Sequence, residues 1–240
     1  MRISRREVIV ASGMAAAGLS VGVLSPSKLL ARPQVPRQDQ PDKLVQTPLR
    51  QIADLPLNPD GSAREYRPEE AGTISEPTLW RYTNNQTPTT EFDITRTKIK
   101  VDARGTANLS GTLTFSDLES LPHHSYVVAL QCASPNPHGI VKWTGVKFSD
   151  FARKLGVQPF AYYCRIVGSD LYWVEEDMQT MMRPQVLLAW LLNDQPIPPK
   201  HGAPLRLIIP FRYGGRSLKA ITEIYFSSNV FAMPKIPPPA

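Results

Sequence analysis

Residues 201–219, HGAPLRLIIPFRYGGRSLK, place a short apolar run directly before a glycine-containing loop. The run 205–209 is apolar at four of its five positions, and Pro210 follows it, so we expect a strand that ends there. Gly214 and Gly215 allow the backbone to turn sharply, so that successive N–H groups can point inward. The segment therefore predicts a strand that leads directly into a tight loop.

Cations surround this loop. They are Arg206, Arg212, Arg216 and Lys219, and the Ser217 hydroxyl lies between the last two. Backbone N–H groups, cations and a hydroxyl together suit an anion, and phosphate or pyrophosphate is the natural guest. The loop is not a Walker A motif, because GxxxxGK[ST] is absent from it. A tight β-turn with solvated charges would give the same pattern, so spacing alone leaves both alternatives open.

Strands and short helices alternate along the chain without a regular βαβ rhythm. The further expected strands are 95–101, 126–130, 162–167 and 221–226. The expected helices are a short one that begins with a Ser116–Glu119 capping-box pattern, then 149–155 ended by Gly156, and 184–192. This mixture predicts an α+β fold with a mixed β-sheet and short helices, rather than a doubly wound sheet.

The two cysteines lie in different settings. Cys132 follows the expected strand 126–130, and Cys164 lies within the expected strand 162–167. A thiol at the end of a strand can be a nucleophile, a metal ligand, a disulfide partner or a core residue. No CxxC motif is present in the sequence, which argues against a structural zinc site.

The N-terminus resembles a bacterial twin-arginine export signal. Arg5 and Arg6 precede the apolar run 8–24, VIVASGMAAAGLSVGVL, and Pro26 follows that run. The run is at the lower edge of the length that spans a bilayer, so residues 1–31 are expected to be a cleaved signal or an uncleaved N-terminal anchor. We expect the rest of the chain in the periplasm, with membrane contact only through such an anchor. A chance arginine pair is the alternative.

Proline-rich segments flank the expected domain. Residues 32–78 show recurrent proline and little periodicity, which predicts an extended arm or linker that can wrap on the domain. The folded domain is expected over 79–233, and a proline-rich tail over 234–240. Residues 1–31 carry +3 of the formal net charge of +6, so the remainder is too weakly basic to indicate a nucleic-acid partner.

An ordered series of short motifs resembles the molybdopterin-binding domain of the sulfite oxidase family. The pieces are LQCA at 130–133, a turn WTGV at 143–146, a helix VLLAW at 186–190, Asn193 with PIP at 196–198, HGAPLR at 201–206 and YGGRSLK at 213–219. The resemblance covers roughly residues 80–227, and it depends on the order of the pieces, since no single piece is specific. The export signal agrees with it, because bacterial members of this family are often exported by that route.

The resemblance implies a molybdenum–molybdopterin cofactor. Cys132 would supply the one protein thiolate to molybdenum, and the pterin dithiolene would supply two further sulfurs. The implied cofactor-binding positions are Arg206, Ser217, Leu218 and Lys219, with His201 before them and Asn84, Asn85 and Gly168 as further matches. A Cys132–Cys164 disulfide would remove the metal ligand, so on this interpretation Cys164 is a packed thiol.

The resemblance implies an oxidoreductase that moves an oxygen atom to or from a small-molecule substrate. Sulfite oxidases usually continue after the cysteine with Ala-Gly-Asn-Arg-Arg, whereas residues 133–139 are ASPNPHG, which weakens the case for sulfite. The methionine-sulfoxide reductase branch has a different run here as well, so the substrate stays open. Arg212 and Arg216 are expected to face an anionic substrate, the pterin or solvent.

The expected domain ends near Met233, which leaves no room for the family's C-terminal dimerisation domain or a fused haem domain. We therefore expect a monomer that exchanges electrons with a separate carrier such as a cytochrome. Two other hypotheses stay open. One is a non-catalytic binding module of the same fold with a phosphate-like pocket. The other is an exported structural domain with a Cys132–Cys164 disulfide.

Overall fold

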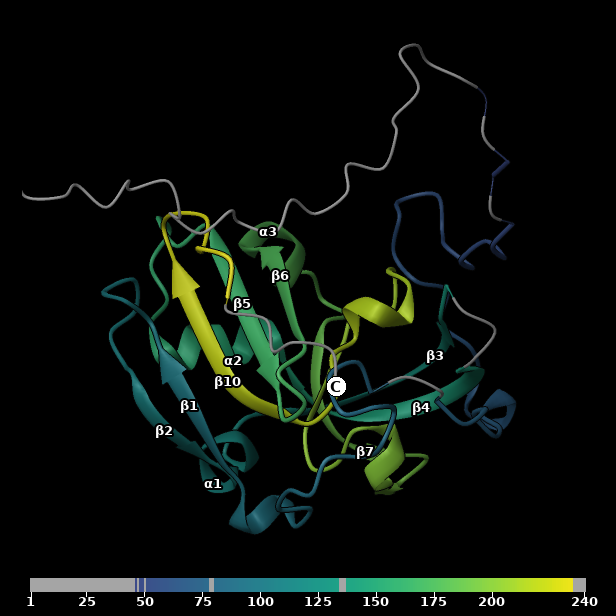
Figure 1. Ribbon diagram of the computed structural model, residues 1–240, viewed down its shortest axis with the longest axis horizontal. Helices are drawn as coiled ribbons and strands as arrows, with labels where there is room; N and C mark the ends of the chain where they lie inside the picture. The colour runs from purple at the N-terminus through teal and green to yellow at the C-terminus, as the bar shows by residue number, and fades with distance from the viewer. Residues whose placement is uncertain (1–45, 47, 50, 78–79, 134–136, 235–240) are drawn as a thin grey trace, which may run out of the picture. The chain divides into compact units, whose positions relative to one another are not determined.

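The computed structural model describes residues 46, 48–49, 51–77, 80–133 and 137–234 (Figure 1). The chain divides into residues 1–49 and 50–240, and the fold below belongs to the second unit. The expected export signal at 1–31, Leu79, residues 134–136 and the tail from 235 onward lie outside the described residues. Within the described part, no helix is both long and apolar enough to cross a membrane.

The first sheet is mixed. Its strands lie in the order β2 (Gly111–Thr114), β1 (Lys98–Asp102), β10 (Ile221–Ser227), β5 (Tyr163–Gly168) and β6 (Trp173–Asp177). β1 and β10 pair in parallel although the chain between them is long, and the other neighbours pair antiparallel. β6 is therefore an edge strand.

The second sheet carries the chain into the expected motif region. Its strands are β3 (His123–Gln131), β4 (His138–Lys147), β7 (Leu187–Leu192) and β8 (Gln195–Pro196) in that order, and β9 (Arg206–Ile208) also pairs with β7. All of these pairs are antiparallel. Two sheets with few short helices confirm the α+β prediction.

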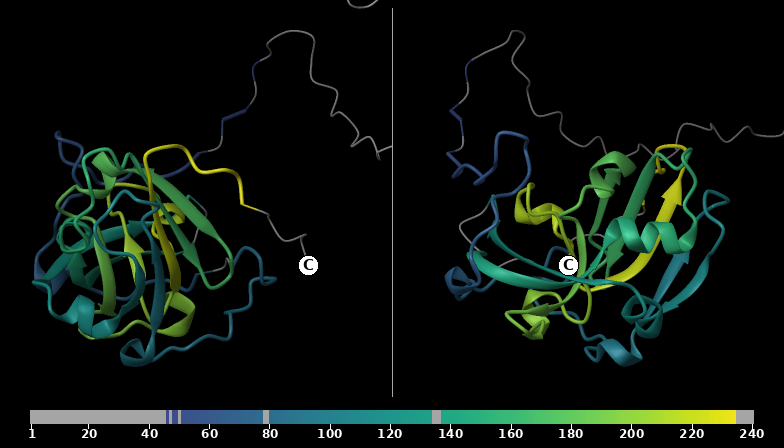
Figure 2. Two further views of the ribbon diagram at one scale, coloured as in Figure 1. Left: turned by 90° about the vertical axis from the view of Figure 1, so that its left-hand side faces the viewer. Right: turned by 180° about the vertical axis from the view of Figure 1, so that it is seen from behind.

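Helix α2 (Phe148–Leu155) packs against the first sheet. It lies behind β10 and β5 in Figure 1 and in front of them in the right panel of Figure 2. Its Phe148 ring centre is 6.1 Å from that of Phe226 on β10, and both side chains are fully buried. Gly156 ends the helix with φ +65°, as the sequence predicts, because glycine adopts this left-handed conformation without a Cβ clash.

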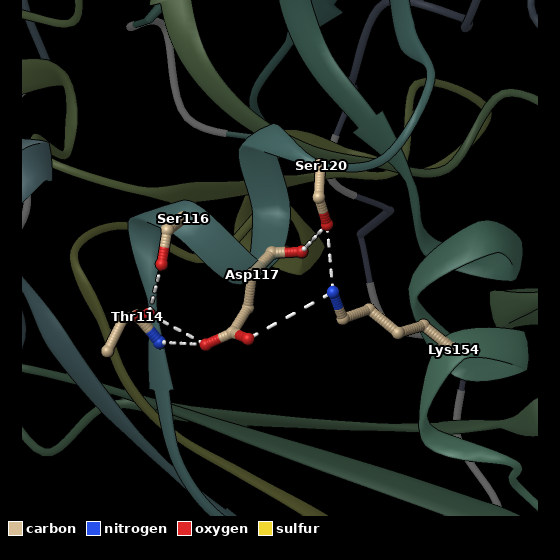
Figure 3. Close-up of polar contacts among 5 residues, drawn as sticks. All are labelled: Thr114, Ser116, Asp117, Ser120 and Lys154. Carbon is tan, nitrogen blue, oxygen red and sulfur yellow. Dashed lines mark hydrogen bonds and ion pairs between the residues drawn. The ribbon is translucent and has the colours of Figure 1, made fainter.

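Helix α1 (Phe115–Glu119) has its N-cap two residues before the expected one. Its N-terminal residue is Thr114, whose N–H and hydroxyl both donate to the Asp117 carboxylate at 2.9 and 2.7 Å (Figure 3). These bonds lower the pKa of the Asp117 carboxyl, while burial acts in the opposite direction. The predicted Ser116–Glu119 capping box is therefore wrong in register, since the threonine two residues earlier takes the capping position.

Two elements inferred from the motif series differ from the structure. The expected helix 184–192 is mostly strand β7, and the expected turn 143–146 lies inside β4. Leu187 and Leu188 are fully buried because β7 is flanked by β4 on one side and by β8 and β9 on the other. A short run that is apolar at every position is compatible with a buried strand and with a buried helix. The sequence pattern alone therefore could not distinguish the two.

Gly145 sits where β4 and β7 approach most closely, next to a register shift between Thr144 and Gly145. A Cβ at Gly145 would lie 2.0 Å from the Leu188 carbonyl oxygen and 2.6 Å from the Ala189 Cα. We expect Gly145→Ala to lower the free energy of unfolding by about 3 kcal/mol or more, because the sheet backbone must move apart. Urea unfolding measures this. Gly72→Ala is the control, since no atom lies within 4 Å of its added Cβ. Equal midpoints for the two variants would contradict the prediction.

The described part of the expected arm, residues 51–77, lies along the second sheet. Glu65 forms an isolated bridge with Val128 on β3, and Ala63 is buried. The Ala63 N–H donates to Gln185 Oε1 at 2.8 Å, and Gln185 Nε2 donates back to the Ala63 carbonyl at 2.9 Å. The segment thus covers the outer strand of the sheet and brings Pro77 to the cavity described next.

Candidate functional site

A cavity opens where β3, β9, the 213–219 loop and the β5–β6 turn meet. Its lining residues are Pro77, Arg81, Cys132, Pro137, Asp170, Tyr172, Arg206, Gly214, Gly215, Ser217, Leu218 and Lys219. The fold therefore brings together five residues that the motif series singled out. They are Cys132, Arg206, Ser217, Leu218 and Lys219.

Cys132 directly follows β3 and is half-buried. Its N–H donates to the Pro137 carbonyl at 3.1 Å, which closes the short loop between β3 and β4. Cys132 and Cys164 are not joined by a disulfide, so the hypothesis of a disulfide-linked structural domain is wrong. Cys164 is a packed thiol on β5, with 1% of its surface exposed, and burial raises the pKa of its thiol well above the ordinary value.

Arg206 places a buried positive charge in the lining of the cavity. It lies on β9 with 2% of its surface exposed, and its Nη1 donates to the His201 carbonyl at 2.7 Å. Its guanidinium carbon lies 5.1 Å from the centre of the Trp143 ring. Burial lowers the pKa of Arg206 to about 10, and the nearby Cys132 thiolate acts in the opposite direction. Among the described residues, Arg206 Nε has no hydrogen-bond partner.

Lys219 brings a second cation to the cavity. Its Nζ lies 3.8 Å from the centre of the Trp80 ring. Burial and the Arg206 charge lower the pKa of Lys219 to about 7, while Asp170 and Cys132 raise it. The Lys219 side chain packs against the backbone of Gly202, which has a φ of +104°. A Cβ on residue 202 would lie 2.7 Å from Lys219 Cβ, so glycine leaves the room that Lys219 needs.

The loop between the two cations is hydrogen-bonded to β9 and the residue after it. The Ile209 N–H donates to Ser217 Oγ at 3.0 Å, and the Leu207 N–H donates to the Leu218 carbonyl at 2.9 Å. Ser217 and Leu218 are each 2% exposed. Their positions are therefore fixed by the protein itself, and the Ser217 hydroxyl proton can point toward a ligand.

His201 lies behind the cavity rather than on its surface. It is 4% exposed, and within the described part of the chain its Nδ1 has no hydrogen-bond partner. Burial and the Arg206 charge lower the pKa of His201, while Glu76 opposes them. The imidazole is therefore kept neutral next to Arg206, and one ring nitrogen stays available to a ligand or water.

Asn84, Asn85 and Gly168 do not line the cavity. Asn84 and Asn85 are exposed in the turn 81–85, with φ of +49° and +62°, which asparagine tolerates well. Gly168 packs behind Lys219, because a Cβ there would lie 2.7 Å from the Lys219 carbonyl oxygen. Gly168 thus acts through backbone packing and not through contact with the cavity.

Two further arginines of the loop also lie outside the lining. Arg212 is exposed, and Arg216 is held by the Glu176 carboxylate and the Glu175 backbone carbonyl of β6. Gly214–Arg216 form a tight 3-10 turn, whereas Arg206 and Lys219 line the cavity.

Five lining residues lie outside the motif series, and three of them, Arg81, Asp170 and Tyr172, form one connected group. Both Asp170 carboxylate oxygens accept backbone N–H groups, Oδ2 from Arg81 at 3.2 Å and Oδ1 from Tyr172 at 3.1 Å. The Arg81 guanidinium carbon lies 4.9 Å from the centre of the Tyr172 ring. Arg81 is 89 positions away from Asp170 in sequence, so only the tertiary fold brings it to the other two.

The cavity suits an anionic group, and Cys132 offers a soft ligand for a metal bound together with that group. Its described lining carries Arg81, Arg206 and Lys219 against the single carboxylate of Asp170. A buried guanidinium with an unsatisfied Nε is costly unless an anion completes it. No group of three or more His, Cys, Asp or Glu among the described residues could hold a metal ion alone. A metal at Cys132 would therefore need most of its ligands from a bound organic group.

The low pKa of Lys219 predicts a pH-dependent stability of the cofactor-free protein. The unfolded lysine binds a proton at pH values where the folded one has lost it, so stability rises with pH above about 7. We expect wild type to gain about 1 kcal/mol or more between pH 7 and 9 relative to Lys219→Met. Urea unfolding of both proteins across this range measures the difference. A constant difference would contradict the prediction.

Known proteins are similar to most of the folded part of this chain. The family model described as the oxidoreductase molybdopterin binding domain matches residues 85–233. Mitochondrial sulfite oxidase of Drosophila melanogaster is 29% identical over 140 residues, covering 47% of this chain and 24% of that protein. The protein-methionine-sulfoxide reductase catalytic subunit MsrP of Xanthomonas campestris pv. campestris is 26% identical over 142 residues, covering 52% and 44%.

A solved structure shows the same fold. The sulfane dehydrogenase SoxCD from Paracoccus pantotrophus superposes with a TM-score of 0.53 at 18% identity, covering 58% of this chain and 40% of that chain. This chain therefore spans less than half the length of each of these three proteins.

Proposed function

Because this chain belongs to the oxidoreductase molybdopterin-binding domain family, we propose that it is a molybdenum oxidoreductase that transfers an oxygen atom between water and a small substrate. When bound, the molybdenum–molybdopterin group supplies the redox chemistry. The protein supplies one thiolate, a positively charged cavity and a fixed loop. The observation that carries the proposal is the buried Arg206 guanidinium, which lies close enough to Cys132 to feel its charge and has an unsatisfied Nε among the described residues.

Cys132 is the proposed metal ligand, and this proposal is supported by its position directly after β3 in the lining of the cavity. A thiolate is a soft, strong donor, and one protein ligand leaves the other coordination positions to the pterin and to reacting groups. Arg206 and Lys219 line the same cavity, so two cationic side chains accompany the proposed thiolate ligand.

Arg206, Ser217, Leu218 and Lys219 are the proposed contacts to the pterin and its phosphate. The two cations and the Ser217 hydroxyl offer donors, and the buried Leu218 backbone holds that segment on β9. His201 is proposed as an additional contact through its unsatisfied Nδ1. Gly168 is proposed only as a packing support. Asn84 and Asn85, which the resemblance also implies, stay a proposal without support from the described cavity.

The substrate class follows the names of the relatives. One relative is a sulfite oxidase and another is a methionine-sulfoxide reductase, so sulfite and sulfoxides are the proposed candidates. Arg81 and Tyr172 also line the cavity, where a small substrate can contact them. Arg216 is not proposed as a substrate contact, because its guanidinium is engaged on β6.

We further propose that the protein works in the periplasm after export by the twin-arginine route, and that electrons pass to or from a separate carrier such as a cytochrome. The arginine pair before the apolar run 8–24 supports the route. The Xanthomonas relative is named a catalytic subunit, which supports a separate partner.

A dye-linked assay tests the proposed activity. Full-length protein from a host that makes molybdopterin is given sulfite with an oxidising dye, and in parallel methionine sulfoxide with a reduced dye. We expect turnover with one of the two. Protein that contains molybdenum but turns over neither substrate would overturn this proposal in favour of the non-catalytic binding module.

A further inference from the structure

The Gly214-Gly215 turn lies directly on Cys132. A Cβ placed on Gly214 would be 3.5 Å from Cys132 Cα and 3.6 Å from Cys132 Cβ. The same point is 3.6 Å from the Gln131 carbonyl oxygen, at the end of β3. The turn therefore covers the base of the cysteine side chain, and any displacement of the turn changes the surroundings of the thiol.

Strand β6 holds this turn from the other side. The Tyr172 hydroxyl, just before β6, donates to the Gly215 carbonyl at 3.0 Å. Arg216 Nε donates to Glu176 Oε1 at 2.6 Å, and Arg216 Nη2 donates to the Glu175 carbonyl. A guanidinium that engages a carboxylate and a carbonyl together is held in one orientation, which a single hydrogen bond cannot achieve.

The ion pair joins β6, the edge strand of the first sheet, to the Gly214–Arg216 turn, which follows β9 of the second sheet. The Glu176 side chain is 10% exposed and that of Arg216 is 38% exposed, so the pair is partly shielded from water. Its strength exceeds that of an ordinary surface pair for this reason.

We infer that Arg216 and Glu176 are a positioning pair that holds the Gly214-Gly215 turn against Cys132 and thereby fixes the place of the thiolate. For its consequence at the metal, this inference rests on the proposed function. Arg216 itself does not line the cavity, so it acts through the turn that it anchors. Residues that position a metal ligand through a second contact commonly change metal affinity or activity by about 10–100-fold when replaced.

The neighbouring residue Glu175 provides a matched control. It is also a partly buried carboxylate on β6, but it pairs with Arg165 on β5, with Arg165 Nη2 2.7 Å from Glu175 Oε2. Only its backbone carbonyl contacts Arg216, and that contact is retained when the side chain is removed. Each of the two variants, Glu175→Ala and Glu176→Ala, therefore removes one β6 carboxylate from an ion pair with an arginine. Only Glu176→Ala is expected to loosen the Gly214-Gly215 turn.

The test measures the alkylation rate of Cys132 by iodoacetamide in the full chain, purified from a host that makes no molybdopterin. Peptide mapping by mass spectrometry separates Cys132 from Cys164, which is 1% exposed and is expected to stay unmodified in the folded protein. We expect Glu176→Ala and Arg216→Ala to raise the Cys132 rate by about 3- to 10-fold over wild type. Glu175→Ala should stay within about twofold of wild type.

Equal rates for Glu176→Ala and wild type, or an equal rise in Glu175→Ala, would overturn the inference. Glu176→Ala leaves the more exposed Arg216 cation, which water can solvate, and Arg216→Ala breaks the same pair from the other side, so agreement between the two variants separates loss of the pair from a folding defect of either one. In the cofactor-loaded chain, the thiolate-to-metal absorption band should shift in Glu176→Ala and not in Glu175→Ala. Because the alkylation test needs no cofactor, its failure would leave the proposed molybdenum chemistry untouched.

Discussion

Cys132→Ala should abolish the oxidoreductase activity and lower the molybdenum content of the purified protein. The loss of activity should exceed about 100-fold, because even residues that only orient a metal ligand cost 10–100-fold when replaced. Cys132 is half-buried at the end of β3, so alanine leaves the strand and its hydrogen bond to Pro137 intact. Dye-linked turnover and metal analysis of the same preparation measure both effects.

Cys164→Ala is the control for this prediction. Cys164 is a core thiol on β5, so its replacement should cost about 1 kcal/mol of stability through lost packing and leave turnover per molybdenum unchanged. Full activity and unchanged molybdenum in Cys132→Ala, or equal losses in both variants, would contradict the role of Cys132.

Arg206→Met should have opposite effects on stability and on cofactor retention. Arg206 is 2% exposed, and of its donors Nε has no partner among the described residues, so its charge is poorly compensated in the cofactor-free chain. Replacing a buried charge by an apolar side chain of similar volume is often neutral or stabilising by about 1–4 kcal/mol. We expect cofactor-free Arg206→Met to unfold at equal or higher urea concentration than wild type, and to retain at least about tenfold less cofactor.

Arg165→Met supplies the contrast. Arg165 is also buried, at 8% exposure, but its guanidinium pairs with Glu175 and donates to the Ala232 carbonyl at 2.8 Å. It also lies 4.6 Å from the centres of the Trp173 and Phe231 rings. Its removal leaves Glu175 unpaired, so Arg165→Met should destabilise the fold and not affect cofactor retention by the folded protein. Destabilisation of Arg206→Met together with normal cofactor retention would contradict the assigned role of Arg206.

The strands with alternating or β-branched patterns were predictable from sequence. β3, β5, β9 and β10 all lie within a few residues of the expected ranges. β1 shows the reason most clearly, because its burial alternates along the strand and one-sided burial imposes a period of two. β7 was not predictable in this way. Its residues are buried on both faces by neighbours that are distant in sequence, and this environment erases the periodicity that distinguishes a strand from a helix.

One part of the candidate site was predictable from sequence, and the other part was not. Cys132 and the residues at 206–219 lie within compact motifs, so an ordered series of motifs identifies them. Arg81, Asp170 and Tyr172 carry no local pattern, and Asp170 contacts Arg81 only because the turn after β5 folds back on the segment before β1. In the sequence, Arg216 is one of several cations of the loop. Its ion-pair partner Glu176 lies on β6, forty residues earlier in the chain. Its pairing is therefore a tertiary property.

Molybdenum and pterin analysis of the full-length protein, purified from a host that makes molybdopterin, tests the central claim most directly. The proposed site predicts stoichiometric molybdenum and pterin in wild type, reduced molybdenum in Cys132→Ala, and loss of both in Arg206→Met. Wild-type protein that is folded and contains neither molybdenum nor pterin would contradict the account.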